Sequence, residues 1–145
     1  MAEPLAGLAA RAAIADVVHG YAHGIRAGAH ADCAALFCDD GVFEIRTLAG
    51  GTRGESTPRD RFEGRAAILD YLARGEAANA AVCPLIHNLV IEIDGDEATG
   101  HSVMTTLVWP AGKQIAGEYR DRFRREGGRW RIAERVFTLF GPFAG

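Results

Sequence analysis

Residues 117–140 read GEYRDRFRREGGRWRIAERVFTLF. Polar and apolar residues alternate through Tyr119 and Phe137, and a Glu-Gly-Gly break interrupts the alternation. Two stretches with this alternation, joined by glycines that can adopt positive φ, are typical of a β-hairpin. The pattern therefore predicts that Tyr119–Arg125 pairs with Trp130–Thr138.

The other expected helices and strands precede this hairpin in the sequence. Strands are expected at Leu85–Ile93 and Ala98–Trp109, because an Asp-Gly-Asp turn signature separates two apolar, β-branched runs. Apolar residues recur at helical spacing from Leu5 to Ala27 and again from Gly64 to Leu72. The remaining expectations are a short helix at Cys33–Phe37, a turn at Asp39–Gly41, a strand at Val42–Ile45 and a loop at Ala49–Phe62, long enough to act as a lid.

The order of these elements predicts the fold class. Helices come first and a run of strands follows, which favours an α+β fold over a regular alternation of strands and helices. We expect one domain over residues 1–145, with a strongly bent antiparallel sheet and three helices. A bent sheet that helices cover incompletely leaves a cavity, so this fold would enclose one apolar pocket.

Composition argues against several classes of partner. The 145 residues carry a net charge of −3, which gives no electrostatic case for nucleic acid or for an anionic membrane. We recognise no export signal and no apolar run long enough to span a bilayer. The three cysteines lack metal-ligand or redox spacing, and no nucleotide-binding fingerprint is present. We therefore expect no metal, no cofactor and a reducing, cytoplasmic location.

Several pieces of sequence, in this order and at these spacings, resemble one family. They are LAARAAIADVVHGYA (residues 8–22), LFCDDGVFEI (36–45), EGRAAI (63–68), NLVIEIDGDEATGHS (88–102), and EYRDRF and GRWRIAER around the final turn (118–123 and 128–135). Together they are similar to the SnoaL-like branch of the NTF2-like superfamily. The resemblance implies a cone-shaped α+β fold. It does not fix a reaction, because the superfamily includes dehydratases, isomerases, polyketide cyclases and non-catalytic binders.

Among the enzymes of this superfamily, the chain resembles scytalone dehydratase and hexachlorocyclohexane dehydrochlorinase. Those enzymes use a histidine that removes a proton from carbon and an aspartate that orients the histidine. The resemblance places Arg26 at the aspartate position and Pro84 at the histidine position. Neither residue acts as a base at neutral pH, so the dyad is absent here. His87 is the nearest candidate base, but strand alternation turns it outward if Asn88 points inward.

Two further residues are candidates for direct contact with a substrate oxygen. In the family, Tyr21 projects from the first helix toward the sheet, where its phenol would donate a hydrogen bond or simply pack in the core. Arg135 on the last strand would hold an oxyanion, or it would form a salt bridge with Glu118 or Asp121 across the hairpin. Arg26 would either enter the pocket and favour an acidic ligand or turn to solvent.

The pocket wall is expected to consist of inward-facing residues. Besides Arg26, we assign substrate contact to Phe43, Asn88, Met104, Thr106, Ile115, Tyr119, Phe137 and Leu139. The leading hypothesis is a cofactor-independent enzyme that eliminates, isomerises or cyclises a small ring-containing molecule. The alternatives are a ligand-binding or accessory protein of the same fold and a purely structural subunit. We also expect a homodimer through the convex sheet face, since one helix layer covers only one side of the sheet.

Overall fold

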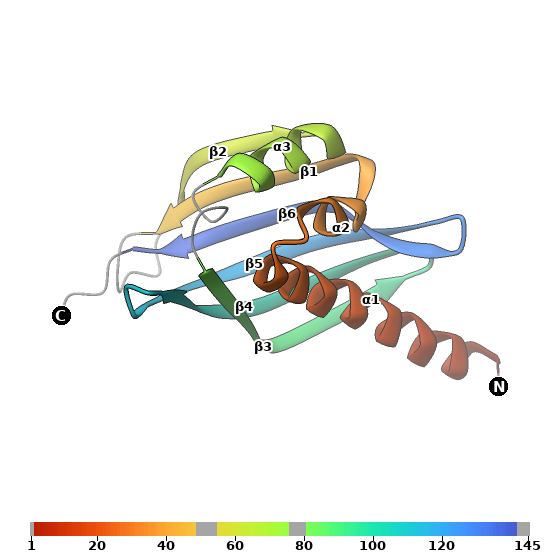
Figure 1. Cartoon of the computed structure of the whole chain (residues 1–145). Helices are drawn as coiled ribbons and strands as arrows, with labels where there is room; N and C mark the ends of the chain where they lie inside the picture. Colours follow the sequence, from red (N-terminus) through yellow and green to blue (C-terminus); the bar gives the residue numbers. More distant parts are fainter. Residues whose placement is uncertain (1, 49–54, 76–80, 142–145) are drawn as a thin grey trace.

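The computed structural model describes residues 2–48, 55–75 and 81–141 (Figure 1). In these ranges the helices are α1 (Ala2–Ala27), α2 (His30–Ala35) and α3 (Arg65–Arg74). The strands are β1 (Phe37–Leu48), β2 (Thr57–Glu63), β3 (Ala81–Asp94), β4 (Glu97–Trp109), β5 (Lys113–Glu126) and β6 (Arg129–Phe140). They form one curved sheet in the order β2-β1-β6-β5-β4-β3, with the helices packed on its concave face (Figure 1). The predicted α+β cone is confirmed.

The C-terminal hairpin forms as the sequence predicts. β5 and β6 pair antiparallel, with Tyr119 opposite Phe137 and Asp121 opposite Arg135. Gly127 and Gly128 in the turn have φ values of 56° and 80°, a region that glycine adopts without steric cost. Tyr21 of α1 faces this hairpin, because its ring packs edge-to-face on Tyr119 with the centroids 6.3 Å apart.

The first strand is longer than expected, and its neighbour is parallel. β1 already begins at Phe37, where we expected a helix end followed by a turn. It pairs parallel with β6, so the sheet is mixed rather than wholly antiparallel. The Asp-Asp-Gly segment is an irregularity inside the strand, since Phe37 lies opposite Ile132 and Val42 already opposite Glu134. Gly41 permits this, because a Cβ there would lie 2.9 Å from the carbonyl oxygen of Cys38.

A second correction concerns the expected loop at Ala49–Phe62. Residues 57–63 form the edge strand β2, antiparallel to β1. Its sequence, TPRDRFE, has a proline and four charged residues, which is typical of a protected sheet edge but hides the strand from a hydrophobicity pattern. Residues 49–54 of the expected lid lie outside the described residues.

The core lies between the helices and the concave face of the sheet. Ile14, Val18 and Tyr21 recur at helical spacing on α1 and are buried there. On the sheet side, Phe123 and Ile132 are buried and fill the closed end of the cone. At the other end the side chains do not fill the space, and a cavity remains.

Candidate functional site

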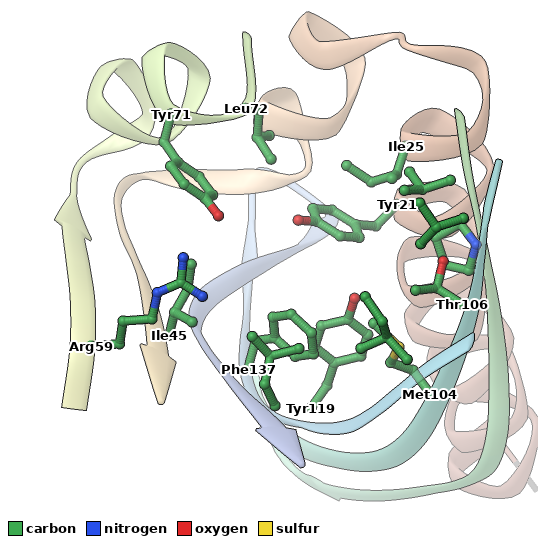
Figure 2. A pocket seen from close by; sticks show the side chains of 15 residues that line it. Tyr21, Ile25, Ile45, Arg59, Tyr71, Leu72, Met104, Thr106, Tyr119 and Phe137 are labelled. Atoms are coloured by element: carbon green, nitrogen blue, oxygen red, sulfur yellow. The ribbon is translucent and has the colours of Figure 1, made fainter. Parts of the chain in front are cut away.

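The cavity has a volume of about 310 Å³ and lies between α1, α3 and the concave face of the sheet (Figure 2). This volume is at the lower end of the range for small-molecule sites. Seven of the residues that the sequence indicated line it: Tyr21, Met104, Thr106, Ile115, Tyr119, Phe137 and Leu139. The lining also includes residues that the sequence pattern did not indicate: Ile25, Ile45, Arg59, Tyr71, Leu72, Val82, Pro84 and Val108.

Strand alternation explains why the wall of β4, β5 and β6 was predictable. Thr106 pairs with Ile115, and Tyr119 pairs with Phe137, so each pair projects from the same face of the sheet. The rings of Tyr119 and Phe137 pack with centroids 5.0 Å apart. This face is therefore one continuous apolar wall with the Tyr119 hydroxyl set into it.

Three phenols line this cavity, those of Tyr21, Tyr71 and Tyr119. Figure 2 shows the hydroxyl of Tyr21 entering from α1 and that of Tyr119 rising from β5. Burial raises the pKa of Tyr119 to about 12, and it raises the pKa of Tyr21 well above the ordinary 10.0. Both groups are therefore neutral hydrogen-bond donors at physiological pH.

Arg135 lies beneath the phenols of Tyr21 and Tyr119 and outside the cavity lining. Its guanidinium carbon is 3.8 Å from the ring centroid of Tyr119 and 4.5 Å from that of Tyr21. Asp121 accepts hydrogen bonds from Nε at 2.8 Å and from Nη2 at 3.0 Å. Of the two alternatives for Arg135, the salt bridge across the hairpin is present, and its partner is Asp121. Burial would lower the pKa of Arg135, but the charge and hydrogen bonds of Asp121 raise it overall.

Three buried side-chain atoms lack a hydrogen-bond partner within the described residues. They are Oγ1 of Thr106, which lines the cavity, Nη1 of Arg135, and Oγ of Ser102, which lies opposite Tyr119. The faces of the two tyrosine rings lie against the guanidinium group, and such π-faces attract a cation. Thr106 lines the cavity from β4 (Figure 2).

Tyr71 and Arg59 bring further polar groups to the cavity from α3 and β2. Tyr71 follows Ile68 by three residues and precedes the buried Leu72, so helical periodicity could have indicated it, although we did not single it out from the sequence. Its ring stacks on Phe62 with centroids 4.3 Å apart. Arg59 gave no such signal, because it falls in the segment that we expected to be a loop.

The other candidate residues lie outside the cavity lining. His87 lies opposite Val103, on the sheet face away from the cavity, and its Nε2 is 2.8 Å from Oγ1 of Thr105. Asn88 is exposed in an irregular step of β3 with φ of 54°, so it does not point inward as expected. Arg26 is exposed near the end of α1. Phe43 is buried beside the cavity, in ring contact with Tyr71 at 5.9 Å.

Residues 6–136 match the SnoaL-like domain family. The chain belongs to this family. The match covers most of the 145 residues and agrees with the cone, the concave cavity and the bent sheet described above. No curated protein matches the chain.

Solved structures share the architecture of this SnoaL-like domain. A Mycobacterium tuberculosis protein whose own function is unknown is 28% identical with a TM-score of 0.76, covering 92% of this chain and 73% of that one. LinA is 21% identical with a TM-score of 0.73, covering 98% and 95%. A Novosphingobium aromaticivorans protein provisionally named a scytalone dehydratase is 18% identical with a TM-score of 0.70, covering 92% and 85%. The latter two likenesses show the fold alone.

The residues that line the cavity determine which chemistry this SnoaL-like domain can perform. The lining contains phenols, a threonine hydroxyl and a guanidinium group, and its described residues include no histidine and no carboxylate. Pro84 itself lines the cavity at the position where the resemblance places a catalytic histidine. The described residues contain no group of three or more potential metal ligands. They also contain no helix long and apolar enough to cross a membrane.

Proposed function

We propose that this SnoaL-like domain is a cofactor-independent enzyme that acts on a small, ring-containing carbonyl compound held in the apolar cavity. The reaction belongs to the elimination, isomerisation and polyketide-type cyclisation group, and cyclisation fits the lining best. The observation that carries the proposal is the pair of neutral phenols, Tyr21 and Tyr119, which line the same cavity of about 310 Å³.

The phenols stabilise negative charge on a carbonyl oxygen. Enolisation or attack on a carbonyl carbon places charge on that oxygen, and fixed donors in a water-poor cavity stabilise this charge without reorganisation. The cation of Arg135 lies against both rings and opposes the rise in the pKa of Tyr21 and Tyr119 that burial causes. Arg135 therefore makes both hydroxyls better donors while remaining out of contact with the substrate.

The absence of a side-chain base in the described lining favours cyclisation. An intramolecular aldol cyclisation forms one carbon–carbon bond and moves one proton from carbon to the new alkoxide oxygen, with no oxidant or reductant. A substrate with acidic protons between two carbonyl groups enolises without a strong base. The cavity then has to fold the chain and stabilise the oxyanion, which apolar walls and two phenols can do.

The second candidate function is a ligand-binding or accessory protein. The same observation favours it, because a cavity without a histidine or carboxylate in its described lining binds without abstracting a proton. An enzyme would convert its ligand to product and a binding protein would not, but both would hold the same class of ligand. The hypothesis of a purely structural subunit is the weakest of the three, because such a subunit has no need of an open cavity.

The first test measures the carbonyl group of a bound ketone. Tetralone, a bicyclic aryl ketone, is titrated into the wild-type protein by calorimetry, and its carbonyl stretch is recorded by infrared difference spectroscopy. Hydrogen bonds from two phenols should lower the stretching frequency relative to an apolar solvent, and Tyr21→Phe or Tyr119→Phe should each reverse part of this shift. An unshifted carbonyl stretch in the wild-type complex would contradict the proposal.

The second test separates enzyme from binder. An aryl diketone whose aldol cyclisation and subsequent loss of water give a conjugated ring product is incubated with the protein, and product absorbance is followed. An enzyme accelerates the reaction, and loss of one oxyanion donor by Tyr119→Phe should lower kcat by about 10²-fold. Saturable diketone binding without acceleration identifies a binder.

A further inference from the structure

The strand register divides the cavity into a phenol end and an aliphatic end. Tyr119 lies opposite Ser102 of β4, and Val108, six residues further along β4, shares the inner face with Ser102. Six residues of an extended strand span roughly 20 Å. Tyr119 and Val108 both line the cavity. The cavity therefore extends along the strands, from the phenol of Tyr119 toward the beginning of β3 and the end of β4.

The end of the cavity away from Tyr119 has an aliphatic wall. Val82 lies opposite Val108, and Pro84 lies opposite Thr106, which pairs with Ile115 on its other side. All five residues line the cavity. Oγ1 of Thr106 is itself buried, so this wall offers mainly carbon to a ligand. Val82, Pro84 and Val108 are only half-buried, so a ligand that covers them removes more apolar surface from water.

The polar groups of the cavity lie elsewhere. Figure 2 shows Thr106 and Ile25 on one side of the hydroxyl groups of Tyr21 and Tyr119, and Tyr71 on the opposite side. The described lining contributed by β3 and β4 contains no charged residue. A ketone whose oxygen accepts hydrogen bonds from the two phenols, and which extends toward β3 and β4, therefore meets an apolar surface.

We propose that Val82, Pro84, Val108 and Ile115 form a subsite for an unbranched alkyl chain carried by the ring-containing substrate. This inference rests on the proposed function, because the phenols of that proposal hold the carbonyl end. Aliphatic side chains offer neither an aromatic face nor a hydrogen-bond partner, so the burial of methylene groups is the driving force that this wall supplies. The substrate class is therefore an aryl ketone or polyketide that carries a saturated tail.

The test uses ketones that differ only in the length of one chain. They are tetralone and tetralones with a methyl, propyl or pentyl group on the aromatic carbon furthest from the carbonyl group, each titrated into the folded protein by calorimetry. Each methylene group that enters the subsite should raise the affinity of the wild type about fourfold. Added salt should leave this gain unchanged, since no charge takes part in it.

Variants on β4 provide matched controls. Val108→Phe fills the subsite, so it should remove most of the gain from the pentyl chain and weaken pentyl-tetralone far more than tetralone. Val108→Ala removes contacts without blocking the subsite, so it should reduce the gain only in part. Val103 lies on the outer face of the same strand, opposite His87. Val103→Phe introduces the same side chain outside the cavity and should leave the gain unchanged.

The outcomes separate this inference from the proposed function. Equal affinity of the wild type for tetralone and pentyl-tetralone, or an equal loss of both in Val108→Phe, overturns the alkyl subsite and leaves the phenol site intact. Tyr119→Phe should weaken all four ketones by the same factor and preserve the gain per methylene group. A gain with chain length together with an unshifted carbonyl stretch supports the subsite and overturns the proposed function. If no ketone binds the wild type, both fail.

Discussion

Asp121 and Arg135 face each other across the β5–β6 hairpin and share two hydrogen bonds, at 2.8 and 3.0 Å, with neither side chain exposed to solvent. The pair holds the guanidinium group against the rings of Tyr21 and Tyr119, 4.5 and 3.8 Å from their centroids. A charge inside the core thus fixes the position of these two phenols, which line the cavity.

Breaking this buried pair should be strongly destabilising. Asp121→Asn or Arg135→Met leaves one charge buried without its partner, and each should lower the free energy of unfolding by about 3–5 kcal/mol. The double variant Asp121→Leu/Arg135→Met should lose less than the sum of the single changes, because no uncompensated charge remains. Urea unfolding measures all of these. The exposed pair of Arg125 and Asp96 is the control, since Arg125→Gln should cost less than about 1 kcal/mol. Equal costs for Arg135→Met and Arg125→Gln would contradict the prediction.

The buried phenols should make the protein less stable in alkali. The pKa of Tyr119 is about 12 in the folded protein, against 10.0 ordinarily. Above about pH 10 the unfolded chain loses the tyrosine proton and the folded chain keeps it, so stability is full below that pH and is lost as pH rises toward 12. Urea unfolding at about pH 11 should give a free energy lower than at pH 8, with Tyr119 contributing on the order of 1 kcal/mol. Tyr119→Phe should remove that contribution. If the free energy of unfolding of this variant falls between pH 8 and pH 11 as much as that of the wild type, the prediction is wrong.

A variant of His87 tests whether a histidine acts as the proton-abstracting base in this protein. A positioned base contributes roughly 10²–10⁴-fold to kcat. Because His87 is exposed on the sheet face away from the cavity, we expect His87→Ala to change tetralone affinity and diketone turnover by less than about twofold. A loss of 10²-fold in kcat with folding intact would instead require His87 to reach the substrate.

The close approach of β5 and β6 at Gly117 should be sensitive to a single methyl group. A Cβ at Gly117 would lie 2.5 Å from the carbonyl oxygen of Thr138 and 2.8 Å from Cε1 of Phe137. Gly117→Ala should therefore lower the free energy of unfolding by about 1–3 kcal/mol and displace Phe137 from the cavity wall. Gly7 in α1 has open space around it, so Gly7→Ala should raise stability by up to about 1 kcal/mol. Thermal unfolding compares the two, and equal melting temperatures would refute the steric argument.

The convex sheet face should form a homodimer interface. Leu85, Val90 and Trp109 are exposed on β3 and β4, with 44%, 58% and 50% of their surfaces accessible. We expect light scattering of the wild type at micromolar concentration to give a dimer, and Leu85→Glu/Val90→Glu to give a monomer. Leu69→Glu, on α3, is the control and should remain dimeric. A monomeric wild type would disprove the interface.

Local pattern alone determined the hairpin and much of the cavity wall. Side chains in a strand alternate between the two faces, so alternation within each strand grouped Met104 with Thr106 on β4, Ile115 with Tyr119 on β5, and Phe137 with Leu139 on β6. The same alternation turned His87 outward only on the premise that Asn88 points inward, and His87 was still kept as the candidate base. Helical spacing likewise placed Tyr21 on the buried face of α1.

Only the tertiary structure decided which residues break that alternation. The bulge at Arg59 and the irregular step at Asn88 exchange inner and outer faces, and each depends on pairing with a distant strand. The sequence left Glu118 and Asp121 as equal partners for Arg135. In the fold, Glu118 lies on the outer face with His101 at 2.9 Å, and Asp121 lies inside opposite Arg135. A periodic sequence fixes relative orientation along one strand, whereas register between strands sets which side chains meet and which of them reach the cavity.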